Sequence, residues 1–111
     1  MYISRLAFHT LPGKTEAVES KLMTLAQWVH EAGGIKPRIM RTHFSSLGAP
    51  DLLFEQEVED PAALEQQIKT VTGKKEFQKW SQEVASLLEQ SSKRELFKII
   101  DSAQSIEFHK I

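Results

Sequence analysis

The stretch RTHFSSLGAPDLLFEQEVE, from Arg41 to Glu59, alternates charged with uncharged side chains on both sides of a small-residue turn. A period of two residues is typical of a β-strand with two different faces. The pattern predicts one strand over residues 36–46 and another over residues 52–59. Gly48-Ala49-Pro50 lies in the loop between them.

The charged residues of this hairpin allow two interpretations. If the turn is centred on Ala49, His43 lies opposite Glu55 and Arg41 lies opposite Glu57. Such cross-strand pairs stabilise a sheet by about 0.2–1 kcal/mol each, which is a sufficient reason for the pattern. If the same side chains face a cavity, Glu55 could instead orient His43 as a general base while Arg41 holds an anion.

The segments on either side of the hairpin supply the remaining elements. Apolar residues recur at helical spacing after Thr15, the expected N-cap, and again after Asp60-Pro61, a strong helix start. The expected elements are a strand over 2–9, a helix from Thr15 to Gly33-Gly34, a helical region from Asp60 that breaks at Gly73 and resumes near Lys75, and a strand over 94–100.

This order, β-α-β-β-α-β with a split second helical region, is that of the ferredoxin-like α+β fold. It predicts an antiparallel four-stranded sheet with helices on one face. The domain is expected to span residues 1–101. Residues 102–111 form a C-terminal tail that allows a short strand over IEFHKI.

The sheet face without helices is predicted to be a dimer interface. Strand parity places apolar and charged side chains on it together, and exposed branched aliphatics favour association. Phe44 and Phe54 have the opposite parity and are expected to pack under the helices. The residues assigned to the uncovered face are Ile3, Arg5, Ala7, His9, Ile39, Arg41, His43, Leu53, Glu55, Glu57, Leu96, Lys98 and Ile100.

Composition narrows the classes of function. The chain has 111 residues, of which 41% are hydrophobic and 26% charged, as in a globular domain. A net charge of -1 and the lack of long basic tracts disfavour nucleic acid as a partner. The chain has no cysteine, so thiolate chemistry is excluded. No segment has the signature of a signal peptide or a membrane span, which favours a cytoplasmic protein with no membrane partner.

The whole chain, apart from its last ten residues, resembles the dimeric α+β barrel proteins, and in particular the antibiotic-biosynthesis-type monooxygenases and the NIPSNAP-like small proteins. The resemblance is carried by the element order, by EVEDPAALEQ after the third strand, by KKEFQKW at the opening of the last helix and by RELFKII in the final strand. It implies two sheets that associate into a barrel with helices outside. It also implies that some relatives oxidise aromatic substrates without metal or flavin.

The resulting functional expectation is a small-molecule enzyme or binding protein that resembles cofactor-independent monooxygenases, with a polar cavity between the sheets of a homodimer. The ligand is expected to be a small aromatic or anionic molecule. The alternative is a non-catalytic interaction or stress-related dimer. The candidate catalytic residues are His43 and Glu55, and the candidate substrate-binding residues are Arg41, His9, Arg5 and Glu57.

No cofactor is expected. The histidines lack the spacing of metal ligands on one helix face, and no HExxH motif occurs, although His9, His43, Glu55 and Glu57 could converge across strands. No glycine-rich phosphate loop opens a helix. Haem-degrading relatives use an asparagine, which this chain lacks, so haem chemistry is disfavoured.

Overall fold

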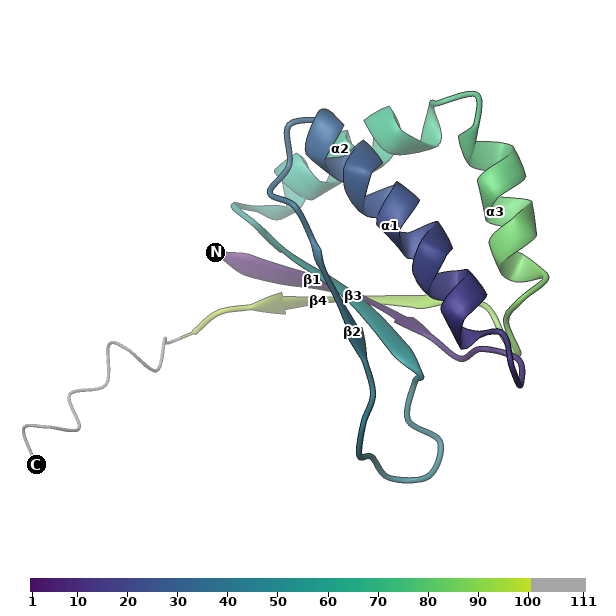
Figure 1. The fold of residues 1–111 in the computed structure, drawn as a ribbon. Helices are drawn as coiled ribbons and strands as arrows, with labels where there is room; N and C mark the ends of the chain where they lie inside the picture. Colours follow the sequence, from purple (N-terminus) through teal and green to yellow (C-terminus); the bar gives the residue numbers. More distant parts are fainter. Residues whose placement is uncertain (101–111) are drawn as a thin grey trace, which may run out of the picture.

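The computed structural model describes residues 1–100, and the predicted tail lies outside the described residues. Four strands and three helices follow one another in the predicted order (Figure 1). Their bounds are β1 Tyr2–Phe8, α1 Thr15–Glu31, β2 Arg38–Arg41, β3 Leu52–Val58, α2 Pro61–Thr72, α3 Phe77–Ala85 and β4 Lys93–Lys98.

The strands form one sheet in the order β2-β3-β1-β4, and each neighbouring pair is antiparallel. All three helices lie on the same side of this sheet (Figure 1). The predicted ferredoxin-like α+β fold is therefore confirmed. The central strands β1 and β3 pair along their whole length, with Arg5 opposite Glu55.

The helix ends follow from local chemistry. Asp60 caps α2 by accepting a hydrogen bond from the Ala63 amide at 2.8 Å, and Pro61 occupies the first turn. Gly33 follows α1 with φ at +90°, a conformation that favours glycine. The N-cap of α1 is Lys14 rather than the predicted Thr15, whose hydroxyl instead forms a hydrogen bond with the Thr10 hydroxyl at 2.8 Å.

The core lies between the helices and the sheet. Val18 and Leu22 on α1 are fully buried, and Leu52 and Phe54 meet them from β3. Trp80 on α3 donates a hydrogen bond from Nε1 to the Lys21 carbonyl at 2.9 Å. This bond satisfies the indole N–H of a buried tryptophan, so α3 is tied to α1 by polar as well as apolar contact.

The strand β2 is shorter than predicted. It ends at Arg41, and the chain then leaves the sheet in a loop that projects away from the helices (Figure 1). Thr42 closes this loop, because its amide donates to the Asp51 carbonyl at 3.0 Å and its hydroxyl donates to the Pro50 carbonyl at 2.6 Å. Phe44 lies within the loop and is 89% exposed, so the prediction that it packs under the helices is wrong.

The predicted hairpin register is also wrong. Arg38, not His43, lies opposite Glu55, and Arg41 lies opposite Leu52. The closure at Thr42 and Asp51 centres the turn before Ala49, which shifts the pairing by an odd number of residues. Such a shift moves every side chain of the strand to the other face.

Two faces of the sheet can now be defined, since residues opposite each other in an antiparallel pair point the same way. The helix face carries Tyr2, Ser4, Leu6, Phe8, Leu52, Phe54, Gln56, Val58, Ile39, Arg41, Arg94, Leu96 and Lys98. The open face carries Ile3, Arg5, Ala7, Leu53, Glu55, Glu57, Arg38, Met40, Lys93, Glu95 and Phe97. The assignments of Ile39, Arg41, Leu96 and Lys98 to the uncovered face are therefore wrong.

Candidate functional site

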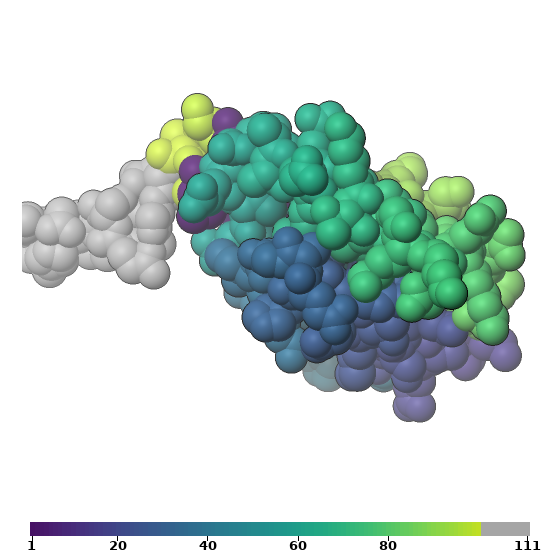
Figure 2. Space-filling model, turned by 90° about the horizontal axis from the view of Figure 1, so that it is seen from above, coloured from purple at the N-terminus to yellow at the C-terminus, as the bar shows by residue number. Residues whose placement is uncertain are grey.

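A cavity of about 580 Å³ lies between the helix face of the sheet and the helices α2 and α3. Figure 2 shows the molecule from the helix side, where the three helices form most of the visible surface. The lining is mainly apolar and partly aromatic. It includes Leu6, Phe8, Leu25, Val29, Phe54, Ile68, Val71, Phe77, Trp80, Val84 and Leu88.

A row of polar side chains crosses this apolar floor. Gln67 on α2 accepts a hydrogen bond at Oε1 from Gln56 Nε2 at 2.6 Å. Gln56 lies directly opposite Ser4 in the β3–β1 register. The Ser4 hydroxyl in turn accepts a hydrogen bond from Nη1 of Arg94 on β4. The row therefore runs across three neighbouring strands and ends on a helix.

Two of these polar residues occupy core positions, which apolar residues usually fill. Ser4 is 1% exposed and Gln56 is 5% exposed, although their strand neighbours on the same face are leucine and phenylalanine. Burying polar groups costs free energy unless hydrogen bonds compensate. The row supplies these bonds and places hydrogen-bonding groups inside an apolar cavity.

Arg94 provides the positive charge of the cavity. The residue as a whole is exposed on the edge strand β4, but its guanidinium reaches inward to the buried Ser4. Burial lowers the pKa of Arg94, yet a guanidinium remains protonated in proteins. No carboxylate among residues 1–100 forms an ion pair with it, and Glu89 is the acidic residue among those that line the cavity.

The amide pair keeps unused hydrogen-bonding capacity. Within the described part of the chain, Gln56 Oε1 and Gln67 Nε2 have no protein partner, and no side-chain polar atom is both fully buried and unpaired. Gln56 Oε1 is therefore a free acceptor beside the cavity, whereas Gln67 Nε2 lies next to Gly34, which does not line the cavity. Together, Arg94 and the Gln56 acceptor can bind a molecule that has an apolar body, an anionic group and a hydrogen-bond donor.

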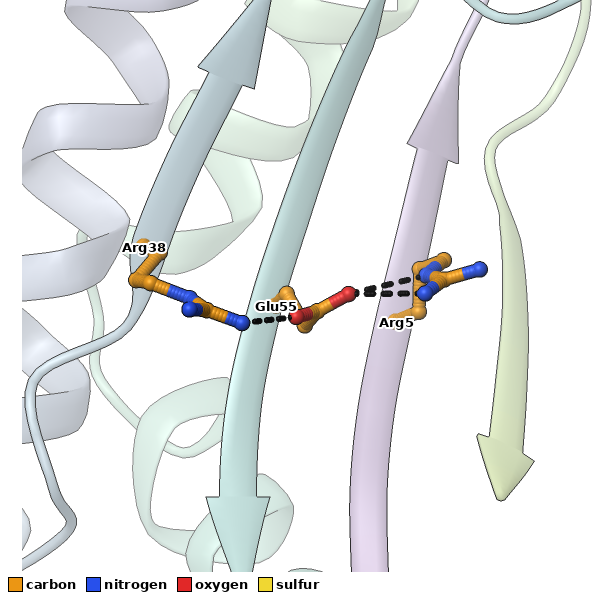
Figure 3. A network of polar contacts seen from close by, with 3 residues as sticks. All are labelled: Arg5, Arg38 and Glu55. Atoms are coloured by element: carbon orange, nitrogen blue, oxygen red, sulfur yellow. Dashed lines mark hydrogen bonds and ion pairs between the residues drawn. The ribbon is translucent and has the colours of Figure 1, made fainter. Parts of the chain in front are cut away.

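The predicted acid on the open face forms a different arrangement. Glu55 lies between two arginines and is 6% exposed (Figure 3). Its Oε2 accepts hydrogen bonds from Arg5 Nε at 3.0 Å and from Arg5 Nη2 at 2.9 Å, and its Oε1 accepts one from Arg38. Burial alone would raise the pKa of Glu55, but the hydrogen bonds and charges of Arg38 and Arg5 outweigh it and lower the pKa. Both carboxylate oxygens are thus engaged by cations.

The remaining predicted site residues lie apart from Glu55. Arg41 pairs with Glu19 of α1 at 2.5 Å on the helix side. His43 is exposed in the loop, with its ring 4.6 Å from that of Phe44.

Two more predicted residues lie at the margins of the open face. His9 donates from Nε2 to the Gly48 carbonyl at 3.1 Å, and Glu57 is exposed opposite Ile3. The structure brings Arg5 to Glu55 but brings neither Arg41 nor His43 to it. None of the six predicted residues lines the helix-face cavity.

Sequence reasoning missed Ser4, Gln56 and Arg94 as site residues. A signal was present, because Ser4 and Gln56 interrupt the apolar parity of two core strands. Arg94 could not be assigned in this way, since its face depends on the register of β4 with β1. Gln67 falls on α2 near its apolar edge and carried no distinct signal.

Residues 1–100 offer neither a metal-binding cluster nor a membrane-spanning helix. No group of three or more histidine, cysteine, aspartate or glutamate side chains is placed to hold a metal ion in this range. In the same range, no helix has the length and apolarity that crossing a membrane requires.

Comparison with known proteins supports the fold. No protein-family model and no curated protein matches the sequence. Among solved structures, the chain is similar to At3g17210 from Arabidopsis thaliana, with 12% identity, a TM-score of 0.70 and coverage of 93% of this chain and 99% of that chain.

Two other matches have names that agree with the predicted resemblance. An antibiotic biosynthesis monooxygenase matches with 14% identity and a TM-score of 0.64 over 91% of this chain and 100% of that chain. A NIPSNAP domain protein from Burkholderia xenovorans matches with 11% identity and a TM-score of 0.66 over 93% of this chain and 96% of that chain. The resemblance is thus confirmed at the level of the fold, which is what identities this low establish.

Proposed function

We propose that the protein binds a small, largely apolar anion in the helix-face cavity, and that it acts as a small-molecule enzyme or binding protein resembling cofactor-independent monooxygenases. The observation that carries this proposal is the Arg94 guanidinium, which reaches an apolar cavity without a carboxylate partner among residues 1–100. The cavity is of the size and character of small-molecule sites, which are mostly apolar with a few polar groups.

The energetics favour an anionic ligand. Partial burial of the Arg94 guanidinium reduces its hydration, so a carboxylate or phenolate that reaches it gains a charge-assisted hydrogen bond worth about 1.5–3 kcal/mol. Phe77 and Trp80 line the same cavity and offer aromatic contact to the body of the ligand. An uncharged ligand of the same shape lacks the first contribution.

An oxidation without metal or flavin has to draw its electrons from the substrate. A ring methylene that is activated by adjacent aromatic rings and by a carbonyl conjugated through them can react with O₂ to give a second carbonyl and water, so that the carbon is oxidised and O₂ is reduced. The aromatic side chains of Phe77 and Trp80 in the cavity support this proposal, because they offer contact to a ring system, and the moles of O₂ consumed per mole of anthrone measure the reaction.

Binding is tested by calorimetry with 2-naphthoate and with the neutral 2-naphthol. We expect wild-type protein to bind 2-naphthoate at least tenfold more tightly, because one charge-assisted hydrogen bond is worth that ratio. Arg94→Met keeps most of the side-chain volume and is expected to abolish the preference. Lys98→Met, on the same strand and face, is the matched control. Equal affinities in wild-type protein would contradict the proposal.

We further propose that the open face pairs with a second copy of the chain. Ile3, Leu53 and Met40 are half-buried there, and Phe97 is 42% exposed beside the Arg5 guanidinium, 5.1 Å from its ring centre. Burying these side chains against the same face of a partner favours a homodimer. Light scattering at micromolar concentration tests this, and a monomer would contradict it.

The alternative is a dimer without enzymatic activity. Such a protein would also be a dimer by light scattering, but it would not bind 2-naphthoate more tightly than 2-naphthol. The predicted roles of His43 and Glu55 as acid and base stay a separate proposal, in which a partner's open face encloses both. Alanine changes at His43 and Glu55, singly and together, test it. Full oxidation of anthrone by the double variant would reject this role.

A further inference from the structure

We propose that Gln67 is the end wall of the ligand cavity and sets the length of ligand that the protein accepts. The inference rests on the proposed function of the helix-face cavity as the binding site. Gln67 would determine specificity at the apolar end of the ligand, while Arg94 binds the anionic group at the other end. The evidence is the position of Gln67 between two hollows and the way its amide is held there.

Gln67 lines two neighbouring hollows and is the residue that their linings have in common. The first is the cavity of about 580 Å³, which Gln67 lines together with Gln56. The second measures about 340 Å³ and lies between the Gly33–Ile35 segment, the end of β3 and α2. The Gln67 side chain therefore forms a partition, with the ligand cavity on one side and the smaller hollow on the other.

The amide of Gln67 is fixed from both sides. On the cavity side, Gln56 Nε2 donates to its Oε1 at 2.6 Å, and Gln56 is itself 5% exposed. On the other side, a Cβ atom added at Gly34 would lie only 2.1 Å from Gln67 Nε2. The absence of a side chain at Gly34 thus leaves room for the amide of Gln67. A side chain held by a hydrogen bond to a buried partner and by close packing makes a rigid wall.

Shortening this side chain is expected to join the hollows. Gln67→Ala removes every atom beyond Cβ, and alanine is the best helix former, so α2 is retained. The cavity then continues past Gln56 into the space beside Gly34. Gln67→Met fills a similar volume without the amide and keeps the partition closed. Gln66→Ala is a matched control. Gln66 directly precedes Gln67 on α2, but it lines only the smaller hollow and not the ligand cavity.

The experiment measures calorimetric affinity for straight-chain saturated carboxylates of increasing length, from hexanoate to tetradecanoate, below their micelle concentrations. Each methylene that enters an apolar site raises affinity about fourfold. We expect this rise to stop in wild-type protein at the length where the chain meets Gln67. In Gln67→Ala the rise should continue for about three more methylenes, the length of the atoms removed. Gln67→Ser provides a second shortened wall if the alanine variant does not fold.

The outcomes separate this inference from the proposed function. A wild-type protein that binds no carboxylate of the series overturns both. Binding with the same length limit in wild-type, Gln67→Ala and Gln67→Ser proteins overturns the role of Gln67 alone. If affinity for Gln67→Met keeps rising to the same carboxylate length as for Gln67→Ala, the role of Gln67 as a wall is also rejected. The length limit would then depend on the hydrogen bond and not on the volume of the side chain. A shift in the two shortened variants alone supports the proposal.

Discussion

The two faces of the sheet use polar residues in opposite ways. On the open face, Glu55 gives both its oxygens to Arg5 and Arg38, so acid and base satisfy each other. On the helix face, Arg94 has one hydroxyl partner, Ser4, and lies beside a cavity. Charged groups that neutralise one another explain stability, whereas a cation with spare donors beside an apolar cavity supports the proposed binding. The density of charge alone does not decide which face carries the proposed site.

The largest expected effect compares neighbouring residues of β3 that face opposite ways. Phe54 is 3% exposed on the helix face, and Phe54→Ala is expected to lower the free energy of unfolding by about 3–5 kcal/mol. Leu53 is half-buried on the open face, so Leu53→Ala is expected to cost about 1 kcal/mol. Urea denaturation measures both values, and equal costs would contradict the assignment of the faces.

The next effect concerns the shared carboxylate. Glu55→Gln removes the charge that joins two arginines and is expected to cost about 2 kcal/mol, the worth of hydrogen bonds to a charged group. Glu57→Gln is the control, since Glu57 is exposed two residues along the same face. Urea denaturation at neutral pH measures the difference. A Glu55→Gln variant as stable as the control would show that the network does not stabilise the sheet.

Acid should erase the difference between wild type and Glu55→Gln. The pKa of Glu55 is lowered in the folded protein, so its contribution is fully present above the unfolded value of about 4.3 and is lost as pH falls through the folded value. Glu19 and Glu83 also have lowered pKa values, but they are present in both proteins and cancel. Urea denaturation at pH 6.5 and pH 3 measures the convergence. A difference that persists unchanged at pH 3 would contradict the assigned pKa direction.

Much of the fold was predictable because it depends on local signals. Asp60-Pro61 starts a helix by capping chemistry, and Gly33 ends one by its backbone freedom. The order of elements then restricts the topology of the sheet. The core position of Phe54 follows from strand parity and is confirmed.

The site was less predictable because it depends on register. Arg38 rather than His43 reaches Glu55. The reason is that the pairing of Thr42 with Asp51 centres the loop before Ala49, whereas Gly48 and Pro50 suggested a turn centred on Ala49. Both sets of pairs look equally favourable in the sequence, because each sets a base against Glu55. Only the geometry of loop closure decides between them.

A change at Arg41 has the smallest expected effect on stability. It also tests whether burial decides how much an ion pair stabilises the fold. Arg41 forms an ion pair with Glu19 at 2.5 Å, shorter than either distance between Arg5 and Glu55, yet the two side chains are 52% and 22% exposed, against 38% for Arg5 and 7% for Glu55. Exposed pairs are screened by water and salt, so short contact there adds little. We therefore expect Arg41→Gln to leave the urea midpoint unchanged in 0.5 M salt. A loss as large as that of Glu55→Gln would show that contact distance, and not burial, determines how much these ion pairs stabilise the fold.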